Sequence, residues 1–388
     1  MKKYKLSDLF DLQMGKTPAR NNPKYWEEGT NPWISIADMS SNGKYITTTK
    51  ECITDRAISD TGIRPIFPGT VIMSFKLSIG KVARTTVKSY SNEAIMAFEI
   101  KDREPSQYTI DNDYAYYLLS ALNFENIGNK AVMGKTLNKA ILENTEVYVH
   151  LWDEQRRIIS KLDKVIELIE LRTQQLSKLD ELVKSQFIEM FGSTILNPFG
   201  WKKDNLGAVC DVRDGTHDSP QYYETGYPLV TSKNVTGGKI DLTDCSLICE
   251  ADYKKINERS KVDMGDIIMP MIGTVGKPVI VDIEPSFAIK NVSLIKFEAD
   301  SRVLNIYIRA LLQSDYFDDA ILSKVRGGTQ KFISLGDIRK LEVLVPPMEL
   351  QEQFAVFVEQ IDKLKLAIQK SLNQLETLKK SLMQKYFG

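Results

Sequence analysis

The chain contains 388 residues, and its 51 Lys and Arg balance 51 Asp and Glu, so the formal net charge is zero. A composition of 43% hydrophobic and 26% charged residues is typical of a globular protein with buried cores, and the length allows two or three domains. Zero net charge excludes a uniformly basic protein that coats nucleic acid without selectivity, but it is compatible with a local basic surface.

Residues 1–151 alternate short β-rich runs with Gly/Pro turns, which is the pattern of an α+β domain. A long helix is predicted next, at residues 153–191, and a turn-rich linker at residues 197–201 leads into a second α+β region. A second long helix is predicted from about residue 349 to 387. The strands that we expect lie at residues 71–75, 94–100, 267–272, 292–297 and 341–345, and the shorter helices at 113–121 and 302–312.

Both long helices carry the apolar seam of a coiled coil, without an internal Gly or Pro. At 1.5 Å per residue, each helix is on the order of 50 Å long. Pro346 and Pro347 are predicted to stop the strand before the second helix, and Gly192 is predicted to end the first. The seam residues are Ile158, Leu162, Val165, Ile169, Leu176, Leu179 and Val183 in the first helix, and Val358, Ile361, Ile368, Leu372, Leu375 and Leu382 in the second.

The second half of the chain repeats the first at an offset of about 194 to 200 residues. The two helices end alike, at residues 190–192 and 386–388, and we align their starts at Glu154-Gln155 and Glu352-Gln353. We therefore divide the chain into domains at residues 1–151 and 193–348, each followed by a helix, at residues 152–192 and 349–388.

Each seam needs a partner, and the two copies are nearly equal in length. We expect the helices to pack on each other antiparallel, with the globular domains at opposite ends in a pseudo-two-fold arrangement. The alternative is that each helix pairs with another protein or dimerises.

Basic residues gather in windows that contain no Asp or Glu. Lys and Arg neutralise phosphates, Arg recognises guanine edges, and Asn or Gln recognises adenine. A single window of this kind occurs by chance, but two of them recur at equivalent places of the repeat, which favours a DNA-binding surface. The windows lie between Asp60 and Glu93, Glu125 and Glu143, Glu224 and Asp241, and Asp319 and Asp337.

The sequence contains only weak matches to motifs for nucleotide binding, methyl transfer or zinc binding. Residues 273–277 lack the spacing of a nucleotide-binding P-loop, and residues 197–199 lack the second Pro of a methyltransferase motif. Cys245 and Cys249 have no matching ligand pair for zinc. We therefore expect neither a catalytic site nor a metal site, and no cofactor bound by this chain. The absence of an apolar membrane span or signal core, with four unevenly spaced Cys, favours a cytoplasmic protein with reduced thiols.

Four motifs in order, on this tandem repeat, resemble the specificity (S) subunit of Type I restriction–modification systems over essentially the whole chain. They are the segments that begin at Gly15-Lys16-Thr17-Pro18 and Asp214-Gly215-Thr216-His217, then Gly327-Gly328-Thr329-Gln330, and finally Val345-Pro346-Pro347. The first copy departs from the family pattern at residues 132–138 and 151–153.

The resemblance implies a non-catalytic subunit with two target recognition domains, each of which recognises one half of a bipartite DNA sequence. Two modification subunits would methylate adenine with S-adenosylmethionine, and restriction subunits that hydrolyse ATP with Mg²⁺ would join them. The helices would then set the spacer between the two half-sites. Two alternatives remain, namely a targeting subunit of a methylation-only or other phage-defence complex, and a coiled-coil adaptor that binds proteins.

Candidate contact residues follow from the basic windows and the motifs. Phosphate contacts are expected from Lys76, Lys81, Arg84 and Lys277. Contacts near base edges are expected from Lys16, Arg20, Lys135, Asn138, His217, Lys233, Arg326, Gln330 and Lys331. Further DNA contacts are expected from Thr17, Thr136, Thr216, Gly328 and Thr329. Contacts with modification subunits are expected from Trp152, Gln155, Arg156, Trp201 and Gln353, although the two Trp could equally be helix-capping aromatics.

Overall fold

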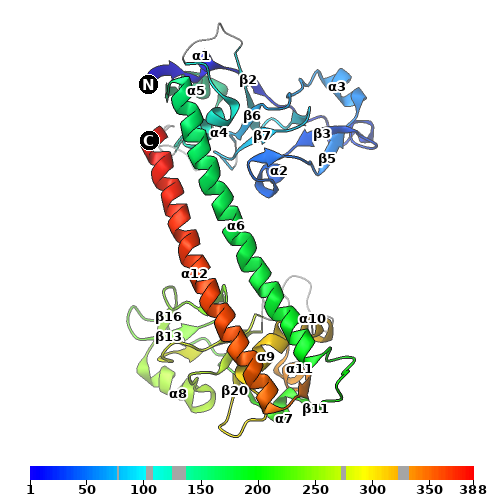
Figure 1. The fold of residues 1–388 in the computed structure, drawn as a ribbon, viewed down its shortest axis with the longest axis vertical. Helices are drawn as coiled ribbons and strands as arrows, with labels where there is room; N and C mark the ends of the chain where they lie inside the picture. Colours follow the sequence, from blue (N-terminus) through cyan, green and yellow to red (C-terminus); the bar gives the residue numbers. More distant parts are fainter. Residues whose placement is uncertain (77, 102–107, 125–136, 272–276, 322–331) are drawn as a thin grey trace. The chain divides into compact units, whose positions relative to one another are not determined.

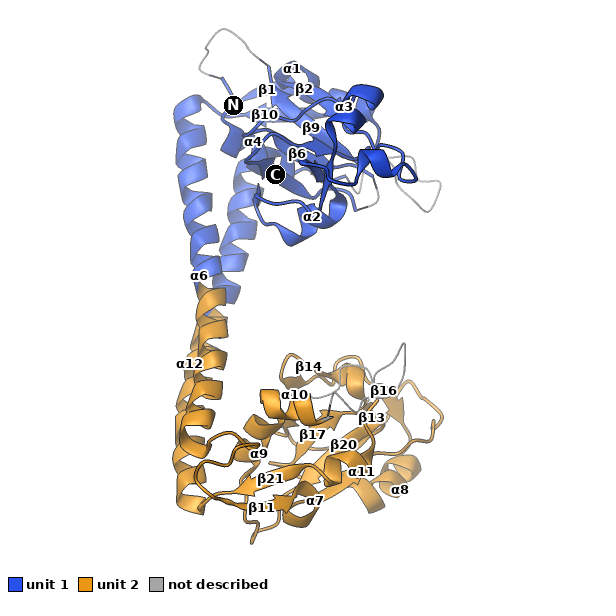
Figure 2. Cartoon of the chain, turned by 90° about the vertical axis from the view of Figure 1, so that its right-hand side faces the viewer, with its two compact units in different colours: residues 1–171, 371–388 blue, residues 172–370 orange. Residues whose placement is uncertain are grey.

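The computed structural model describes the chain apart from residues 77, 102–107, 125–136, 272–276 and 322–331 (Figure 1). It forms two compact units: residues 1–171 with 371–388 make unit 1, and residues 172–370 make unit 2 (Figure 2). The division falls inside two helices of 40 residues each, α6 (Trp152–Phe191) and α12 (Met348–Phe387). Each unit therefore combines one globular part with half of each long helix.

The globular part of unit 1 contains a five-stranded sheet in the order β2-β9-β6-β7-β4 and a three-stranded sheet in the order β5-β3-β8. Its strands are β1 (Lys2–Lys5), β2 (Phe10–Met14), β3 (Asn31–Ile34), β4 (Tyr45–Ile46), β5 (Glu51–Ile53), β6 (Val71–Ser74), β7 (Val82–Thr85), β8 (Tyr90–Ser91), β9 (Ile95–Ile100) and β10 (Glu146–Val149). Its helices are α1 (Leu6–Leu9), η1 (Pro23–Tyr25), α2 (Ile36–Ser41), α3 (Asp55–Thr61), α4 (Asn112–Ser120) and α5 (Lys139–Asn144).

The central strands of this sheet are buried on both faces because successive side chains point to opposite sides. Val71 and Met73 of β6 belong to the core under α4 and α6, whereas Ile72 belongs to a second core under α2. This double burial explains why β6 is an uninterrupted apolar run in the sequence.

The two long helices lie antiparallel in unit 1, since the start of α6 and the end of α12 share one core. Ile158 and Leu162 of α6 are buried against the sheet, and Leu382 and Phe387 of α12 pack on the same cluster. The ring of Phe387 lies 5.3 Å from that of Tyr114 on α4.

Unit 2 repeats this arrangement, with a four-stranded sheet in the order β12-β20-β17-β18 and a three-stranded sheet in the order β16-β13-β19. Its strands are β11 (Lys202–Asn205), β12 (Asp211–Asp214), β13 (Tyr227–Val230), β14 (Val235–Thr236), β15 (Lys239–Ile240), β16 (Ser246–Ile248), β17 (Ile267–Pro270), β18 (Val279–Ile280), β19 (Ala288–Ile289), β20 (Val292–Lys296) and β21 (Glu342–Val345). Its helices are α7 (Leu206–Val209), η2 (Ser232–Asn234), α8 (Glu250–Ser260), α9 (Asn305–Leu312), α10 (Asp315–Ile321) and α11 (Leu335–Arg339).

In unit 2 the roles of the long helices are exchanged, and they are again antiparallel. The end of α6, with Phe187 and Phe191, packs beside Phe354 and Val358 at the start of α12. The ring of Phe191 lies 4.8 Å from that of Tyr307 on α9. The fold class expected from the sequence, two tandem α/β domains each followed by a long helix of an antiparallel pair, is therefore confirmed.

A buried Gln near the start of each long helix fixes the alignment of the two copies. Gln155 accepts a hydrogen bond from the backbone of Asp111 (3.1 Å) and donates to the carbonyls of Thr109 and His150 (2.9 Å each). Gln351 makes the same three kinds of bond in unit 2, accepting from Leu304 N and donating to two backbone carbonyls. The alignment of Gln155 with Gln353 is therefore wrong, because the buried equivalent lies two residues earlier.

The predicted ends of the helices agree well with the structure. Gly192 adopts a left-handed conformation (φ 75°), and its backbone N–H bonds to the carbonyl of Ile188 at 2.8 Å, which ends α6. Pro346 and Pro347 separate β21 from α12 as expected. None of the helices in the described part of the chain combines the length and apolarity that are needed to cross a membrane.

Candidate nucleic-acid interface

In unit 1, the loop that follows edge strand β2 (residues 15–20) packs tightly on the turn before β9 (residues 92–94). Gly15 donates its backbone N–H to Ile95 O (3.1 Å), and Lys16 donates its backbone N–H to Ser91 O (2.8 Å). A Cβ atom on Gly15 would lie 2.2 Å from Asn92 O, so only glycine allows this approach.

The corresponding loop of unit 2 (residues 215–220) follows edge strand β12 and packs on the turn before β20 (residues 290–291). Gly215 donates its backbone N–H to Val292 O and Thr216 donates its own to Ile289 O, both at 3.0 Å. A Cβ atom on Gly215 would lie 2.4 Å from Ile289 O. The glycines of both predicted motifs are thus required for the same reason, because a side chain at either position would clash with the backbone of the turn.

In unit 1, a side-chain contact joins the loop to the turn. The hydroxyl of Thr17 donates to the carboxylate of Glu93. This hydrogen bond is the main reason why the pKa of Glu93 is lowered, and the positive charges of Lys76 and Arg20 lower it further. Glu93 is exposed and ionised, so it presents a hydrogen-bond acceptor at the surface.

Arg20, at the end of the same loop, is held by aromatic rings and by an acid. Its guanidinium lies 3.9 Å from the ring centroid of Trp26 and 4.6 Å from that of Trp33. It also bonds both carboxylate oxygens of Glu51, at 2.6 and 3.1 Å. The bonds to Glu51 use two of the five N–H donors of Arg20 and fix the orientation of its guanidinium.

Lys16 and Lys81 each use their amine for one protein contact. Lys16 donates to Thr61 O at 2.6 Å, and Lys81 donates to the hydroxyl of Ser40. An ammonium group has three donors, so both retain hydrogens for a phosphate.

Arg84 lies in an ionic network beside α6. Its guanidinium donates to Asp113 (2.8 Å) and to Gly69 O (3.1 Å). Lys44 bonds the same Asp113 at 2.9 Å and Asp163 of α6 at 2.7 Å. We therefore remove Arg84 from the residues expected to bind phosphate, because its bonds join two parts of the globular part, and Lys44 extends the network to α6.

In unit 2, His217 forms the contact between loop and turn. Its Nδ1 donates to Asn291 Oδ1 at 2.9 Å, and its Nε2 donates to Asp214 Oδ2 at 2.8 Å. The bond to Asn291 and the bond to Asp214 raise the pKa of His217 against the opposing effect of burial. Two acceptors favour the imidazolium form, and with both ring nitrogens occupied His217 is not free to bond a base in this conformation.

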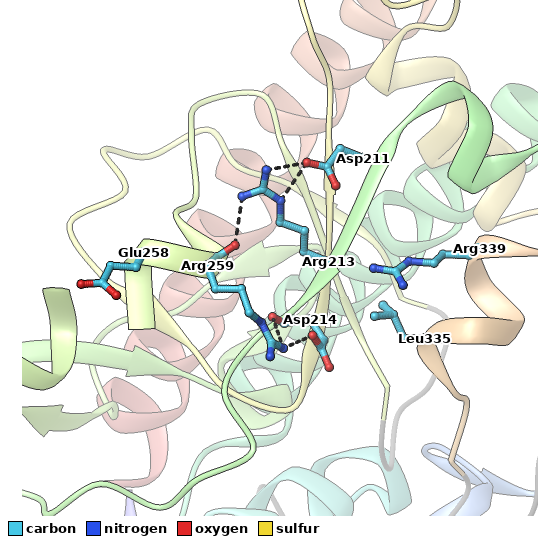
Figure 3. Close-up of a pocket in the computed structure, with 7 residues that line it drawn as sticks. All are labelled: Asp211, Arg213, Asp214, Glu258, Arg259, Leu335 and Arg339. Carbon is cyan, nitrogen blue, oxygen red and sulfur yellow. Dashed lines mark hydrogen bonds and ion pairs between the residues drawn. The ribbon is translucent and has the colours of Figure 1, made fainter. Parts of the chain in front are cut away.

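Asp214 also borders a surface hollow of about 630 Å³, shown in Figure 3. Arg259 pairs with Asp214, and Arg213 pairs with Asp211 at 2.6 Å. Arg339 donates twice to Val212 O, at 2.9 and 2.6 Å. The hollow is lined by Asp211, Arg213, Asp214, Glu258, Arg259, Leu335 and Arg339.

Among the other predicted contacts, Lys233 and Lys277 are exposed and Thr216 is half-buried. Asn138 caps α5 by accepting a hydrogen bond from Ile141 N (2.9 Å), so a helix cap accounts for it. Seven predicted contacts lie outside the described residues: Lys135, Thr136, Arg326, Gly328, Thr329, Gln330 and Lys331.

The residues expected to bind a partner divide into exposed and internal ones. Trp152, Arg156 and Gln353 are exposed. Trp201 is half-buried, and its indole N–H donates to Phe191 O at 3.1 Å, in line with the capping alternative. Gln155 is fully buried and makes only the internal bonds described above, so we withdraw it as a partner contact.

The partners of the loop residues were not predicted from the sequence. Glu93 and Asn291 lie in the turns, Asp214 at the end of β12, and Lys290 bonds the hydroxyl of Ser219 at 2.6 Å. Charge windows could not find them, because they were chosen for their lack of acids. The alignment of the two copies was the signal that could have revealed the turns.

A family model described as the Type I restriction modification DNA specificity domain matches residues 1–181 and 198–377. The MjaIX specificity subunit of a Type I restriction enzyme from Methanocaldococcus jannaschii is 27% identical over 414 aligned residues, covering 98% of this chain and 91% of that relative. The EcoBI specificity subunit from Escherichia coli is 20% identical over 358 aligned residues, covering 83% and 73%.

Solved structures show the same fold. The S subunit of a Type I restriction–modification system from M. genitalium superposes with a TM-score of 0.53 at 16% identity, covering 100% of this chain and 96% of that one. A chain from a structure of complex assembly and conformational transition in the type I R-M system gives a TM-score of 0.59 at 17% identity, covering 99% and 96%.

Proposed function

The chain belongs to the family of Type I restriction–modification DNA specificity domains, and from this premise we propose that it recognises a bipartite DNA target, one half-site with each globular part. It is the specificity subunit, and the chemistry of the complex is assigned to its partners. Modification subunits would transfer the methyl group from S-adenosylmethionine to adenine, and restriction subunits would hydrolyse ATP.

One observation carries the proposal of two half-sites. The two units repeat the same loop, packed on the same turn with equivalent backbone hydrogen bonds, but with different side chains at the surface. Conserved geometry with changed chemistry is what two recognition domains for different sequences require, because base edges are distinguished by donor and acceptor pattern.

The long helices are proposed to set the distance between the half-sites and to bind the modification subunits. Exposed leucines recur at equivalent positions of the two helices, Leu168 with Leu364 and Leu182 with Leu378. Exposed apolar side chains on a helix are suited to a protein partner. Their recurrence fits one modification subunit for each copy of the repeat.

Co-expression with a modification subunit and methylation mapping of the host genome tests the proposal. We expect one motif with two specific blocks around a non-specific gap. Inserting one helical turn of about four residues after Gln174 and after its equivalent Lys370 adds about 5.4 Å and should lengthen the gap by one or two base pairs.

A matched insertion of the same length between Gly237 and Gly238, in the turn that joins β14 to β15, is the control and should leave the gap unchanged. Methylation without a bipartite motif would contradict the recognition proposal. An unchanged gap after the helix insertion would contradict the role of the helices.

A further inference from the structure

The turn that precedes the central strand occupies the same place in both units. In unit 1 it joins β8 of the small sheet to β9 of the large sheet, and in unit 2 it joins β19 to β20. Its first residue bonds the small sheet in each case, since Asn92 N donates to Ile34 O (3.2 Å) and Lys290 N donates to Val230 O (2.9 Å). We call residues 92–94 and 290–291 the junction turns.

The two junction turns differ in the polar side chain that each holds against its loop. Unit 1 presents the carboxylate of Glu93, and unit 2 presents the amide of Asn291. A carboxylate accepts a hydrogen bond from the exocyclic amine of cytosine, whereas an Asn amide can bond adenine through both its oxygen and its nitrogen. The difference between the units is therefore a difference in the base that each turn can recognise.

Both side chains are oriented before any ligand binds. Thr17 donates to Glu93, and His217 donates to the amide oxygen of Asn291, which leaves the amide N–H groups as donors and a second lone pair on the oxygen. Ordering in advance lowers the entropy lost on binding.

The surroundings of the turns suit a polyanion. The positive charges of Lys76 and Arg20 act on Glu93 in unit 1. In unit 2, Lys290 of the turn is buried with its amine bonded to Ser219, and Arg259 is paired with Asp214, which also bonds His217. The positive charges beside both turns reduce the repulsion between the nearby carboxylates and a DNA backbone.

We propose that Glu93 and Asn291 are specificity-determining residues, Glu93 for a cytosine in one half-site and Asn291 for an adenine in the other. Thr17 and His217 are the positioning residues that hold them. The inference rests on the proposed function. It goes further by naming the side chains that discriminate between bases.

The test is methylation mapping of the complete complex with the variants Glu93→Gln and Asn291→Asp. Both changes keep the size of the side chain and an oxygen that can accept from Thr17 or His217. Aspartate also tolerates the left-handed backbone of Asn291 (φ 55°). One well-placed pair discriminates by about 1–3 kcal/mol, so discrimination should fall by about 5- to 150-fold at one position of one half-site.

The untouched half-site is a control within each molecule, because misfolding of the subunit would lower methylation of every site. Glu99→Gln on β9 and Gln313→Glu after α9, both exposed, are matched controls and should keep the wild-type motif. Asn291→Gly, which also permits the left-handed backbone, should relax the same position as Asn291→Asp.

The inference is overturned if both variants keep the full motif with wild-type discrimination at every position. A wild-type complex that methylates no bipartite motif would instead refute the proposed function. The two failures are therefore distinguishable in one experiment.

Discussion

At one place beside the long helices, unit 1 uses an ionic network where unit 2 uses apolar side chains. In unit 1, Arg84 and Lys44 meet Asp113 of α4, and Lys44 also bonds Asp163 of α6. In unit 2 the equivalents of Arg84 and Asp113 are Ile280 and Ile306, and both pack on the apolar core. One place in the fold is thus stabilised by two different kinds of interaction.

The ionic network of unit 1 requires a more exact geometry than the apolar packing of unit 2. Burial alone would lower the pKa of Lys44, but the hydrogen bonds that it donates to Asp163 and Asp113 raise it overall, so the amine stays charged. The rings of Tyr45, Tyr116 and Tyr117 surround the amine at 4.9 to 5.4 Å. Charged pairs need a fixed geometry to offset their desolvation, whereas apolar packing depends on shape alone. At this place the stability of unit 1 therefore depends on the orientation of charged groups, and that of unit 2 on how well apolar side chains fill the space.

The largest expected effect concerns the Phe that ends each long helix. Phe191 is fully buried among Phe187, Tyr307 and Phe354, whereas Phe387 is only half-buried. We expect Phe191→Ala to lower the free energy of unfolding by about 3–5 kcal/mol. Phe387→Ala should cost only about 1–2 kcal/mol, because less of its ring leaves water on folding.

Denaturant unfolding of the full chain, followed by circular dichroism, measures both losses. Phe199→Ala is the control, since this ring is 52% exposed and its loss should change stability by less than about 0.5 kcal/mol. Equal losses for Phe191 and Phe387 would show that the two helix ends are docked equally well.

A second, smaller effect tests the ionic network directly. Lys44→Met removes the charge between two carboxylates, and it should cost about 1–3 kcal/mol, less than in a fully buried pair because Asp163 is partly exposed. Adding Asp163→Asn should restore part of this loss, since it removes one unpaired charge. Lys50→Met at an exposed site is the control for the loss of a positive charge. If the double variant is as unstable as Lys44→Met alone, the ion pair between Lys44 and Asp163 does not contribute to stability.

Periodicity and internal repetition predicted the parts of the fold that depend on local pattern. The seam spacing located α6 and α12 to within one residue at their starts, and the glycines of the two loops were found from their motifs. The network of Lys44 could not be predicted, because Lys44 and Asp163 are 119 residues apart and only the folded sheet brings them together. Gln155 was aligned with Gln353 because both follow a Glu in the sequence. The burial of Gln351 identifies it as the true equivalent of Gln155.

The candidate site was predicted less completely than the fold. Thr17 and His217 were named, but their partners Glu93 and Asn291 lie 76 and 74 residues away along the chain. A search of the sequence for cationic residues also selects residues such as Arg84, which forms an internal ion pair in the structure. Charge alone does not separate a DNA contact from a structural pair, because the deciding factor is which acid the fold places beside it.

The smallest expected effect is a difference in titration between the two units, since each contains one of the chain's two His. Burial lowers the pKa of His150, whose Nδ1 lies within hydrogen-bond distance (2.7 Å) of the hydroxyl of Tyr114. The bonds to Asn291 and Asp214 raise the pKa of His217. Nuclear magnetic resonance titration of the two imidazoles should therefore give midpoints on opposite sides of the usual value of about 6.5. His217→Gln assigns the signals by removing one of them.

The signs of the two shifts predict opposite pH dependences for the two units. His150 contributes stability above its unfolded pKa, and this contribution is lost as the pH falls toward its lowered folded pKa. His217 contributes stability below its unfolded pKa, and this contribution is lost as the pH rises through its raised folded pKa. Because His217 is largely exposed, the effect should stay below about 1 kcal/mol, or a few-fold in recognition of its half-site. Midpoints that coincide would mean that His217 is not held between two acceptors in solution, and the positioning of Asn291 would then need another residue.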